Sequence, residues 1–195
     1  AAVSVMVDGS KARSPYREAN RPYSRLETMH HKVLRWARNS GLGAPMIFQS
    51  DDIVIGDIGN KTLVLINSKK NPTAEEYEHV LTTYRRLGSE LANYRCLAIT
   101  DGAGPTLQQR QQLQREFGKT IANIKTAVVS DAITVRFVVS SAALFIKTIK
   151  AFDVKEFSAG LDFLGIGESD HAAVNAQLGE IPKGKFETLD AALSR

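Results

Sequence analysis

Residues 99–117 have the sequence ITDGAGPTLQQRQQLQREF, in which an apolar strand end, a glycine-rich corner and a glutamine-rich helix follow one another directly. A buried strand that turns at once into a helix is the repeating unit of α/β proteins with parallel sheets. Pro105 suits the first turn of the helix, because that turn leaves its N–H groups unpaired anyway. The corner from Asp101 to Thr106 lies where many α/β proteins present backbone N–H groups to a ligand. This stretch therefore predicts an α/β fold and marks one candidate site.

The same alternation of strand and helix continues on both sides of the corner. Residues 59–61 supply the turn of a tight hairpin, and Thr73 with Glu76 forms a capping box at a helix start. The predicted strands cover 46–48, 53–58, 62–67, 94–100, 124–130 and 153–157, and the predicted helices cover 73–87, 105–117, 131–150, 158–164, 171–178 and the residues from 187 onward. This order predicts an α/β fold with a mostly parallel sheet and an antiparallel hairpin at its N-terminal start.

The first 44 residues differ from the rest in composition. Residues 1–23 are polar, basic and interrupted by prolines, which predicts an arm without regular structure. A capping-box pattern at Ser24 and Glu27 starts a helix that ends at Gly41, and its narrow apolar stripe needs a surface to dock on. The stripe consists of Leu26, Met29, Val33 and Trp36. We divide the chain into a basic arm with an amphipathic helix (1–44), an α/β domain (45–165) and a C-terminal helical extension (166–195).

The composition, with 43% hydrophobic and 24% charged residues among 195, is that of an ordinary globular protein. The single cysteine, Cys96, allows no disulfide framework and suits a reducing cytoplasm, where we expect the protein. The longest apolar run, 134–149, contains two cations and is too short to cross a bilayer. Much of the net charge of +4 comes from the first forty residues. Such an arm attracts nucleic acid, an anionic membrane or an acidic protein; because no nucleic-acid-binding motif accompanies it, we favour an unstructured tail.

The sequence carries no pattern typical of catalysis or metal binding. The corner at 101–106 lacks the Lys-Ser or Lys-Thr of a P-loop and the glycine spacing of a dinucleotide fingerprint, so we do not expect nucleotide hydrolysis. Adjacent residues of a helix point about 100° apart, so His30 and His31 do not converge on one metal. We expect all four histidines at the surface: His30, His31, His79 and His171. Without a nucleophile elbow or a spaced acid pair, an enzyme is the least supported class, and we expect no cofactor.

Three stretches of the chain show a family resemblance. They are DIVIGDIGNKTLVLINS, RCLAITDGAGPT and TAVVSDAITVRFVVSSAALFIKTIKAFDVKEFSAGLDFLGI. Together they resemble the STAS superfamily and, within it, the SpoIIAA-like or STAS/SEC14-type proteins common in bacteria. The resemblance implies a sheet of four or five strands with helices mainly on one side. It also implies non-enzymatic binding of a partner protein or a small ligand at the corner after the third strand.

In the anti-sigma antagonists of this superfamily, that corner holds a phosphorylatable serine in an Asp-Ser-Ser-Gly context. Asp101 matches the aspartate, but Gly102 and Ala103 stand in place of the serine, so a phosphoswitch of the usual kind is not expected. Thr106 is a substitute hydroxyl, although a threonine at a helix start is more often a cap.

Two interpretations of the corner remain open from the sequence. It is either an anion- or partner-binding site, at which backbone N–H groups and a helix dipole converge, or an ordinary turn. The residues that would form such a site are Thr100, Asp101, Gly102, Gly104, Thr106 and Arg136. Arg136 belongs to the first turns of the next predicted helix, where it either pairs with a carboxylate such as Asp101 or Asp131 or is solvated.

The predicted helix 131–150 is apolar around much of its circumference and therefore needs cover on more than one side. Val138 and Phe145 on this helix, together with the stripe of the N-terminal helix, form the predicted interface. We expect a non-enzymatic bacterial regulatory or scaffolding domain that acts by protein–protein interaction and self-associates as a homo-oligomer. Nucleic acid and membranes are not expected as partners. The alternative is a SEC14-like carrier of a small apolar ligand or lipid, held between the sheet and the long helix.

Overall fold

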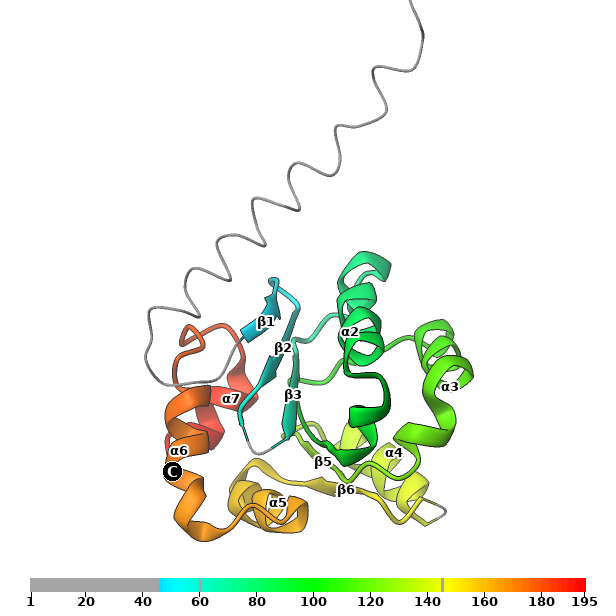
Figure 1. Ribbon diagram of the computed structural model, residues 1–195. Coiled ribbons are helices and arrows are strands. Elements are labelled where there is room, and N and C mark those ends of the chain that lie inside the picture. Colours follow the sequence, from blue (N-terminus) through cyan, green and yellow to red (C-terminus); the bar gives the residue numbers. More distant parts are fainter. Residues whose placement is uncertain (1–45, 60, 145) are drawn as a thin grey trace, which may run out of the picture.

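The computed structural model describes residues 46–59, 61–144 and 146–195. Within these ranges six strands form one sheet in the order β1-β2-β3-β4-β5-β6, and each strand pairs with its neighbours in the sequence (Figure 1). The strands are β1 (Met46–Gln49), β2 (Ile53–Asp57), β3 (Thr62–Asn67), β4 (Arg95–Thr100), β5 (Thr126–Val129) and β6 (Ile149–Phe152). The pairs β1–β2 and β2–β3 are antiparallel, and the pairs from β3 to β6 are parallel.

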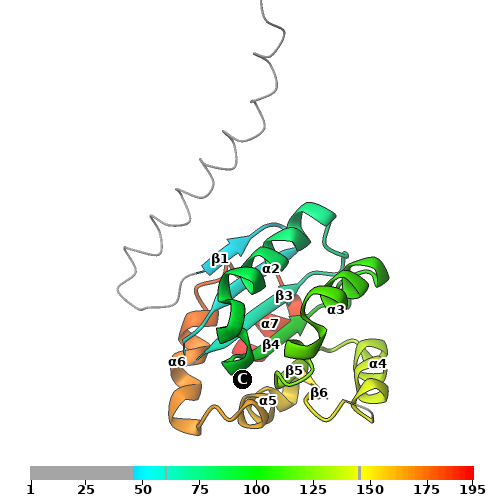
Figure 2. The same cartoon turned by 45° about the vertical axis from the view of Figure 1, so that its right-hand side comes forward.

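Helices cover both faces of the sheet. They are α2 (Ala74–Leu87), α3 (Leu107–Ile121), α4 (Ile133–Ala143), α5 (Phe157–Leu164), α6 (Glu168–Leu178) and α7 (Glu187–Leu193), with 3-10 turns η2 (Gly88–Asn93) and η3 (Val154–Glu156). In Figure 1 the sheet is seen nearly edge-on, with α6 and α7 on its left and α2, α3 and α4 on its right. After a 45° turn, α2 and α3 lie side by side over the same face (Figure 2). The sheet is therefore the middle of three layers.

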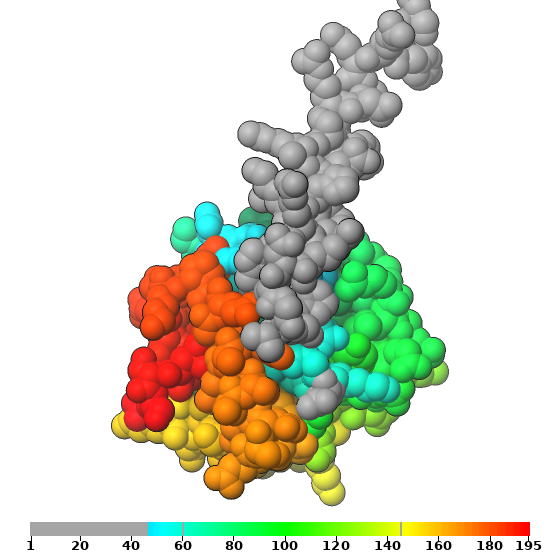
Figure 3. All heavy atoms as spheres, turned by 60° about the vertical axis from the view of Figure 1, so that its left-hand side comes forward, coloured from blue at the N-terminus to red at the C-terminus, as the bar shows by residue number. Residues whose placement is uncertain are grey.

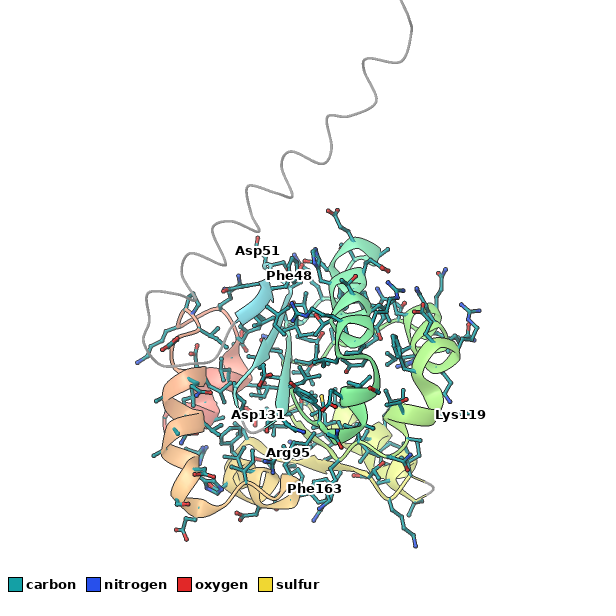
Figure 4. The ribbon with its side chains drawn as sticks, in the orientation of Figure 1. Phe48, Asp51, Arg95, Lys119, Asp131 and Phe163 are labelled. Atoms are coloured by element: carbon teal, nitrogen blue, oxygen red, sulfur yellow. The ribbon has the colours of Figure 1, made fainter. Side chains whose placement is uncertain are left out.

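One face of the sheet forms a tightly packed core with α5, α6 and α7. The strand residues of this core are Val54, Val64, Ile66, Leu97, Ile99, Ala127, Val129 and Phe152. They pack against Leu161 of α5, Leu178 of α6 and Leu189 of α7, all fully buried. Arg95 strengthens this layer by donating to the carbonyl of Leu164 at the end of α5, at 2.8 Å. Figure 4 labels Arg95 in the lower half of the molecule, just above Phe163 of α5. The C-terminal residues, orange to red in Figure 3, form a continuous surface on this side.

The other face is covered less completely. The capping box predicted at Thr73 is present: its hydroxyl accepts from the N–H of Glu76 at 3.2 Å, and the Glu76 carboxylate accepts in return. From this start α2 buries Tyr77, Val80, Leu81 and Tyr84 against the sheet. In contrast, α3 buries only Gln109, and its main neighbours are α2 and η2. This layer is therefore packed more tightly beneath α2 than beneath α3.

The α/β class, the N-terminal hairpin and the parallel strands agree with the sequence prediction. The sheet has six strands, as many as the sequence pattern predicts, whereas the family resemblance implies four or five. The last strand, β6, is formed not by residues 153–157 but by residues 149–152, which were expected at the end of the long helix. The carbonyl of Thr148 accepts from the N–H of Thr126 at 2.7 Å, which draws this segment into the ladder beside β5. The helix accordingly ends at Ala143.

Two further details differ from the sequence prediction. Helices lie on both faces and not mainly on one, because α5 and the residues after 165 supply apolar side chains that cover the second face. Residues 153–157, predicted as a strand, form η3 and the start of α5, since Asp153 and Glu156 make a capping box. The predicted arm and helix in 1–44 lie outside the described residues. None of the helices in the described part of the chain has the length and apolar character needed to span a membrane.

Candidate functional site

The corner after β4 is built around the carboxylate of Asp101, which serves as a cap for α7. It accepts from the backbone N–H of Thr188 at 2.7 Å and of Glu187 at 3.2 Å. The Thr100 carbonyl accepts from the hydroxyl of Thr188 at 3.1 Å, and the Thr100 hydroxyl accepts from the N–H of Gly102 at 3.1 Å. The φ of Gly102 is 134°, a value that residues with a Cβ rarely adopt. These contacts join the corner to the C-terminal helix.

Gly104 and Thr106, the other predicted residues of the corner, also have partners within the protein. The Gly104 carbonyl accepts from the side chain of Asn71 at 2.6 Å. The Thr106 hydroxyl accepts from the N–H of Gln109 at 3.3 Å and so caps α3. Each predicted corner residue thus has a structural role, which favours the turn interpretation, and an anion site there stays a prediction.

Arg136 pairs with a carboxylate, but with neither of the two proposed from the sequence. Its Nη1 lies 2.8 Å from Oδ2 of Asp153 and donates to the carbonyl of Ser130 at 2.6 Å. This pairing arises because β6 runs parallel to β5 and ends beside the first turns of α4. Arg136 therefore ties together the ends of two strands and does not reach Asp101 or Asp131.

Replacing Asp153 with asparagine should destabilise the protein in a pH-dependent way. The backbone N–H of Lys155 and then the charge of Arg136 hold the pKa of Asp153 below its ordinary value. A carboxyl whose pKa is lower in the folded state stabilises the fold above its unfolded pKa, and this contribution is lost as pH falls through the folded pKa. We expect Asp153→Asn to lower the Tm at neutral pH and to converge with the wild type in strong acid. Thermal unfolding across this range is the test, and a pH-independent difference would contradict the expectation.

The predicted interface is described only in part. Val138 is 63% exposed, and α4 has no buried residue. Large apolar side chains in and just after α4 are between 46% and 79% exposed: Ile133, Phe137, Val138, Leu144 and Ile146. The other predicted interface residues, Leu26, Met29, Val33, Trp36 and Phe145, lie outside the described residues.

The histidines within the described part of the chain are less exposed than predicted. His79 is half-buried and stacks on Phe48, with ring centroids 3.8 Å apart. The side chain of His171 is 14% exposed and bonds to the carbonyl of Ile166 at 3.1 Å. Both imidazoles fill packing positions at the border of a core layer. His30 and His31 lie outside the described residues.

The least expected feature is a cavity of about 580 Å³ between the sheet and the helices α2 and α3. Leu65 and Ala98, in the middle of the sheet, line it from one side. Tyr84 of α2 and Leu113 of α3 line the opposite side, and Ile146, just before β6, lines one end. The lining is mainly aliphatic and aromatic, as is usual for sites that bind small molecules.

The cavity exists because this face of the central strands is not fully covered. Leu65 and Ala98 are only partly buried, although a strand in the interior of a parallel sheet is normally covered on both faces. Their neighbours on the opposite face, Ile66 and Leu97, are 0% exposed. The methyl group of Ala98 leaves space that α3 does not fill. The cavity therefore results from the small side chain of Ala98 and from the gap between α3 and the sheet.

Two titratable groups in the lining remain neutral at physiological pH. Burial raises the pKa of the Tyr77 phenol to about 12, a rise that the nearby charge of Arg110 reduces. Burial also raises the pKa of the Cys96 thiol to about 12. A thiol with such a pKa is a poor nucleophile, because the thiolate is the reactive form. No group of three histidine, cysteine, aspartate or glutamate side chains in the described ranges is placed to hold a metal ion.

Sequence reasoning did not find the polar residues of this cavity. Asn67, Tyr77 and Arg110 all line it. Asn67 occupies an inward position at the end of an apolar strand, which is a weak signal for a buried polar function. Tyr77 lies among the buried residues of α2, where an aromatic side chain is expected for packing alone. Nothing in the sequence distinguishes Arg110 from the other polar residues of a helix rich in glutamine and arginine.

No protein-family model matches this chain, and neither a curated protein nor a solved structure matches it significantly. The STAS resemblance therefore stays a prediction.

Proposed function

We propose that this protein binds a small, largely apolar ligand in the cavity beneath α2 and α3, without converting it chemically. The observation that carries this proposal is a cavity of about 580 Å³ that reaches Leu65 and Ala98 in the centre of the sheet. Protein interiors are close-packed, and cavities much larger than a water molecule are few. Ligand pockets commonly measure about 300–1,000 Å³. The size, the apolar lining and the position beside the central strands all suit an organic molecule.

The lining residues support binding more than turnover. Catalysis of proton transfer or nucleophilic attack needs a base or an activated nucleophile near the operating pH. The Tyr77 phenol and the Cys96 thiol of the cavity are both protonated in that range. The carrier alternative considered from the sequence placed the ligand between the sheet and the long helix. The cavity instead lies beneath α2 and α3, and Ile146, after the shortened helix, lines only one end of it.

Binding of a neutral fluorescent probe tests the proposal. N-phenyl-1-naphthylamine should bind the wild type saturably, and Ala98→Phe, which places a ring in the cavity, should weaken binding by about tenfold or more, equivalent to about 1.4 kcal/mol. Phe137→Ser removes an exposed ring of α4 that does not line the cavity, so this control should bind as the wild type does. Unchanged binding by Ala98→Phe, or loss of binding in Phe137→Ser, would overturn the assignment of the cavity.

A second candidate function is self-association through α4, and the exposed apolar residues of α4 favour it. Phe137 is 72% exposed and Leu144 is 79% exposed. Patches of this kind on soluble proteins commonly mark contact with another protein. The control variant serves here too, because light scattering at high concentration should find a dimer or larger species for the wild type and a monomer for Phe137→Ser. A wild-type monomer would remove this candidate.

A further inference from the structure

One end of the cavity contains buried polar atoms whose hydrogen-bonding capacity is unused. Asn67 is 7% exposed and Tyr77 is 3% exposed, and both line the cavity. Within the described residues, neither Oδ1 of Asn67 nor the hydroxyl of Tyr77 has a hydrogen-bond partner. Leaving a buried polar group unpaired is costly, and buried polar groups are nearly always satisfied. Two unpaired polar atoms in the lining of one cavity indicate that a bound ligand supplies their hydrogen-bond partners.

The fold brings a cation to the same end. Asn67 is the last residue of β3, Tyr77 lies near the start of α2, and Arg110 lies near the start of α3. These positions meet because parallel strands end at one edge of the sheet and the helices that follow them begin there. Gln109 fixes the arrangement by donating to the carbonyls of Pro72 at 2.9 Å and Thr73 at 3.2 Å. The starts of α2 and α3 are thereby tied together.

Arg110 is placed to supply a positive charge to this end. It lines the cavity while remaining exposed, so it lies where the cavity meets solvent. Its charge acts on the Tyr77 phenol. No carboxylate of the described ranges lies within 4.0 Å of its guanidinium nitrogens. The polar end thus combines an O–H donor, a carbonyl acceptor and a cation, while the rest of the lining is mainly apolar.

We propose that this polar end binds the head of an aliphatic hydroxy acid, that is, an apolar chain whose carboxylate lies close to a hydroxyl group. Tyr77 donates its O–H to the carboxylate, and Arg110 provides the opposite charge. Oδ1 of Asn67 accepts from the hydroxyl of the ligand, which a simple carboxylate lacks. The aliphatic chain extends over Leu65 and Ala98 toward the apolar end. This inference rests on the proposed function, since it names the chemical class of ligand for the same cavity.

Each alternative head leaves one of these groups unsatisfied. A plain fatty acid offers no donor to Asn67, whereas a fatty alcohol offers a donor but no charge to Arg110. A fatty amine places its ammonium beside the guanidinium. Hydrogen bonds to charged groups are worth about 1.5–3 kcal/mol, which corresponds to roughly tenfold to a hundredfold in affinity. The ligand class should therefore be visible as selectivity among compounds that share one chain.

Competition against N-phenyl-1-naphthylamine tests the head chemistry. The compounds are 3-hydroxydodecanoic acid, dodecanoic acid, dodecan-1-ol and dodecylamine, which differ only in the head. The hydroxy acid should bind most tightly, followed by the plain acid, with the amine weakest. Tyr77→Phe and Arg110→Gln should each reduce the preference for acid over alcohol by about tenfold. Asn67→Leu should remove the preference for the hydroxy acid over the plain acid.

Tyr94→Phe is the matched control, because it is the same substitution at a tyrosine that does not line the cavity and whose hydroxyl donates to Asp57 at 3.1 Å. It should keep the selectivity of the wild type, and thermal unfolding of every variant confirms that it is folded. If the probe binds but the four compounds compete equally, or if selectivity survives in Tyr77→Phe, Arg110→Gln and Asn67→Leu, the head assignment is overturned and the proposed function stands. If the probe itself does not bind the wild type, the proposed function fails as well.

Discussion

Phe186→Ala is expected to lower the free energy of unfolding by about 3–5 kcal/mol. Phe186 is 1% exposed and is the largest fully buried side chain within the described residues. Its ring belongs to the core formed by the sheet with α5, α6 and α7, so its removal leaves a cavity that the surrounding strands cannot close. The effect is large because the whole ring is buried in the same core as the central strands, although Phe186 lies near the C-terminal end of the sequence.

Urea unfolding followed by far-UV circular dichroism measures this loss. The matched control is Phe137→Ala on α4, where the ring is 72% exposed and the change should stay within about 0.5 kcal/mol. A similar loss in both variants would contradict the burial difference between the two rings. A loss of less than about 1 kcal/mol for Phe186→Ala would show that residues 166–195 contribute little to the stability of the sheet.

Ala127→Phe and Ala98→Phe are expected to differ sharply in stability, although they are the same substitution on adjacent strands. Ala127 is 0% exposed and faces the packed core of α5, α6 and α7. Overpacking such a site costs about 1–3 kcal/mol or more, and we expect the upper end for a phenyl ring. Ala98 faces the cavity, where a ring meets empty space. Ala98→Phe should therefore remain within about 1 kcal/mol of the wild type.

The same urea titrations, run on both variants, provide the measurement. A comparable destabilisation by Ala98→Phe would mean that the space above Ala98 is filled in solution. This result would also disqualify the variant as a probe of ligand binding. Equal tolerance at both sites would mean that the two faces of the sheet are packed alike, contrary to the structure.

Much of the fold could be predicted because its boundaries carry local chemistry. The capping box at Thr73, the cap at Thr106 and the turn at 59–61 mark where elements begin and end. The structure contains the box and the cap, which at Thr106 is a full capping box with Gln109, and it describes the turn except for residue 60. β6 was not predicted, because residues 133–152 are largely apolar and the polar residues among them follow neither a helical nor a strand period. Such a run has no period that separates a helix from a following strand, and only pairing with β5 decides the outcome.

Most of the candidate site could not be predicted from the sequence. Asp101 was predicted as a contact for an anion or a partner; in the structure its partners are backbone N–H groups 86 and 87 residues later, a relation that no local pattern contains. A cavity is a deficit of packing between elements, so it has no residue signature of its own. Two features of the sequence are related to the cavity. One is the small side chain of Ala98 in an otherwise bulky strand, and the other is the small number of large apolar residues in α3.

The loose seating of α3 has a consequence for how the molecule moves. Apart from Gln109, no residue of α3 is fully buried, and its exposed link to α2, the 2.8 Å ion pair between Arg85 and Glu116, adds little stability in water. Segments with few buried apolar contacts open locally at a small fraction of the free energy that global unfolding requires. Departure of α3 would uncover Ala98 while the sheet and its opposite layer stayed intact. For a ligand bound as proposed, such opening widens the access that already exists at Arg110, so exchange of the ligand does not require global unfolding.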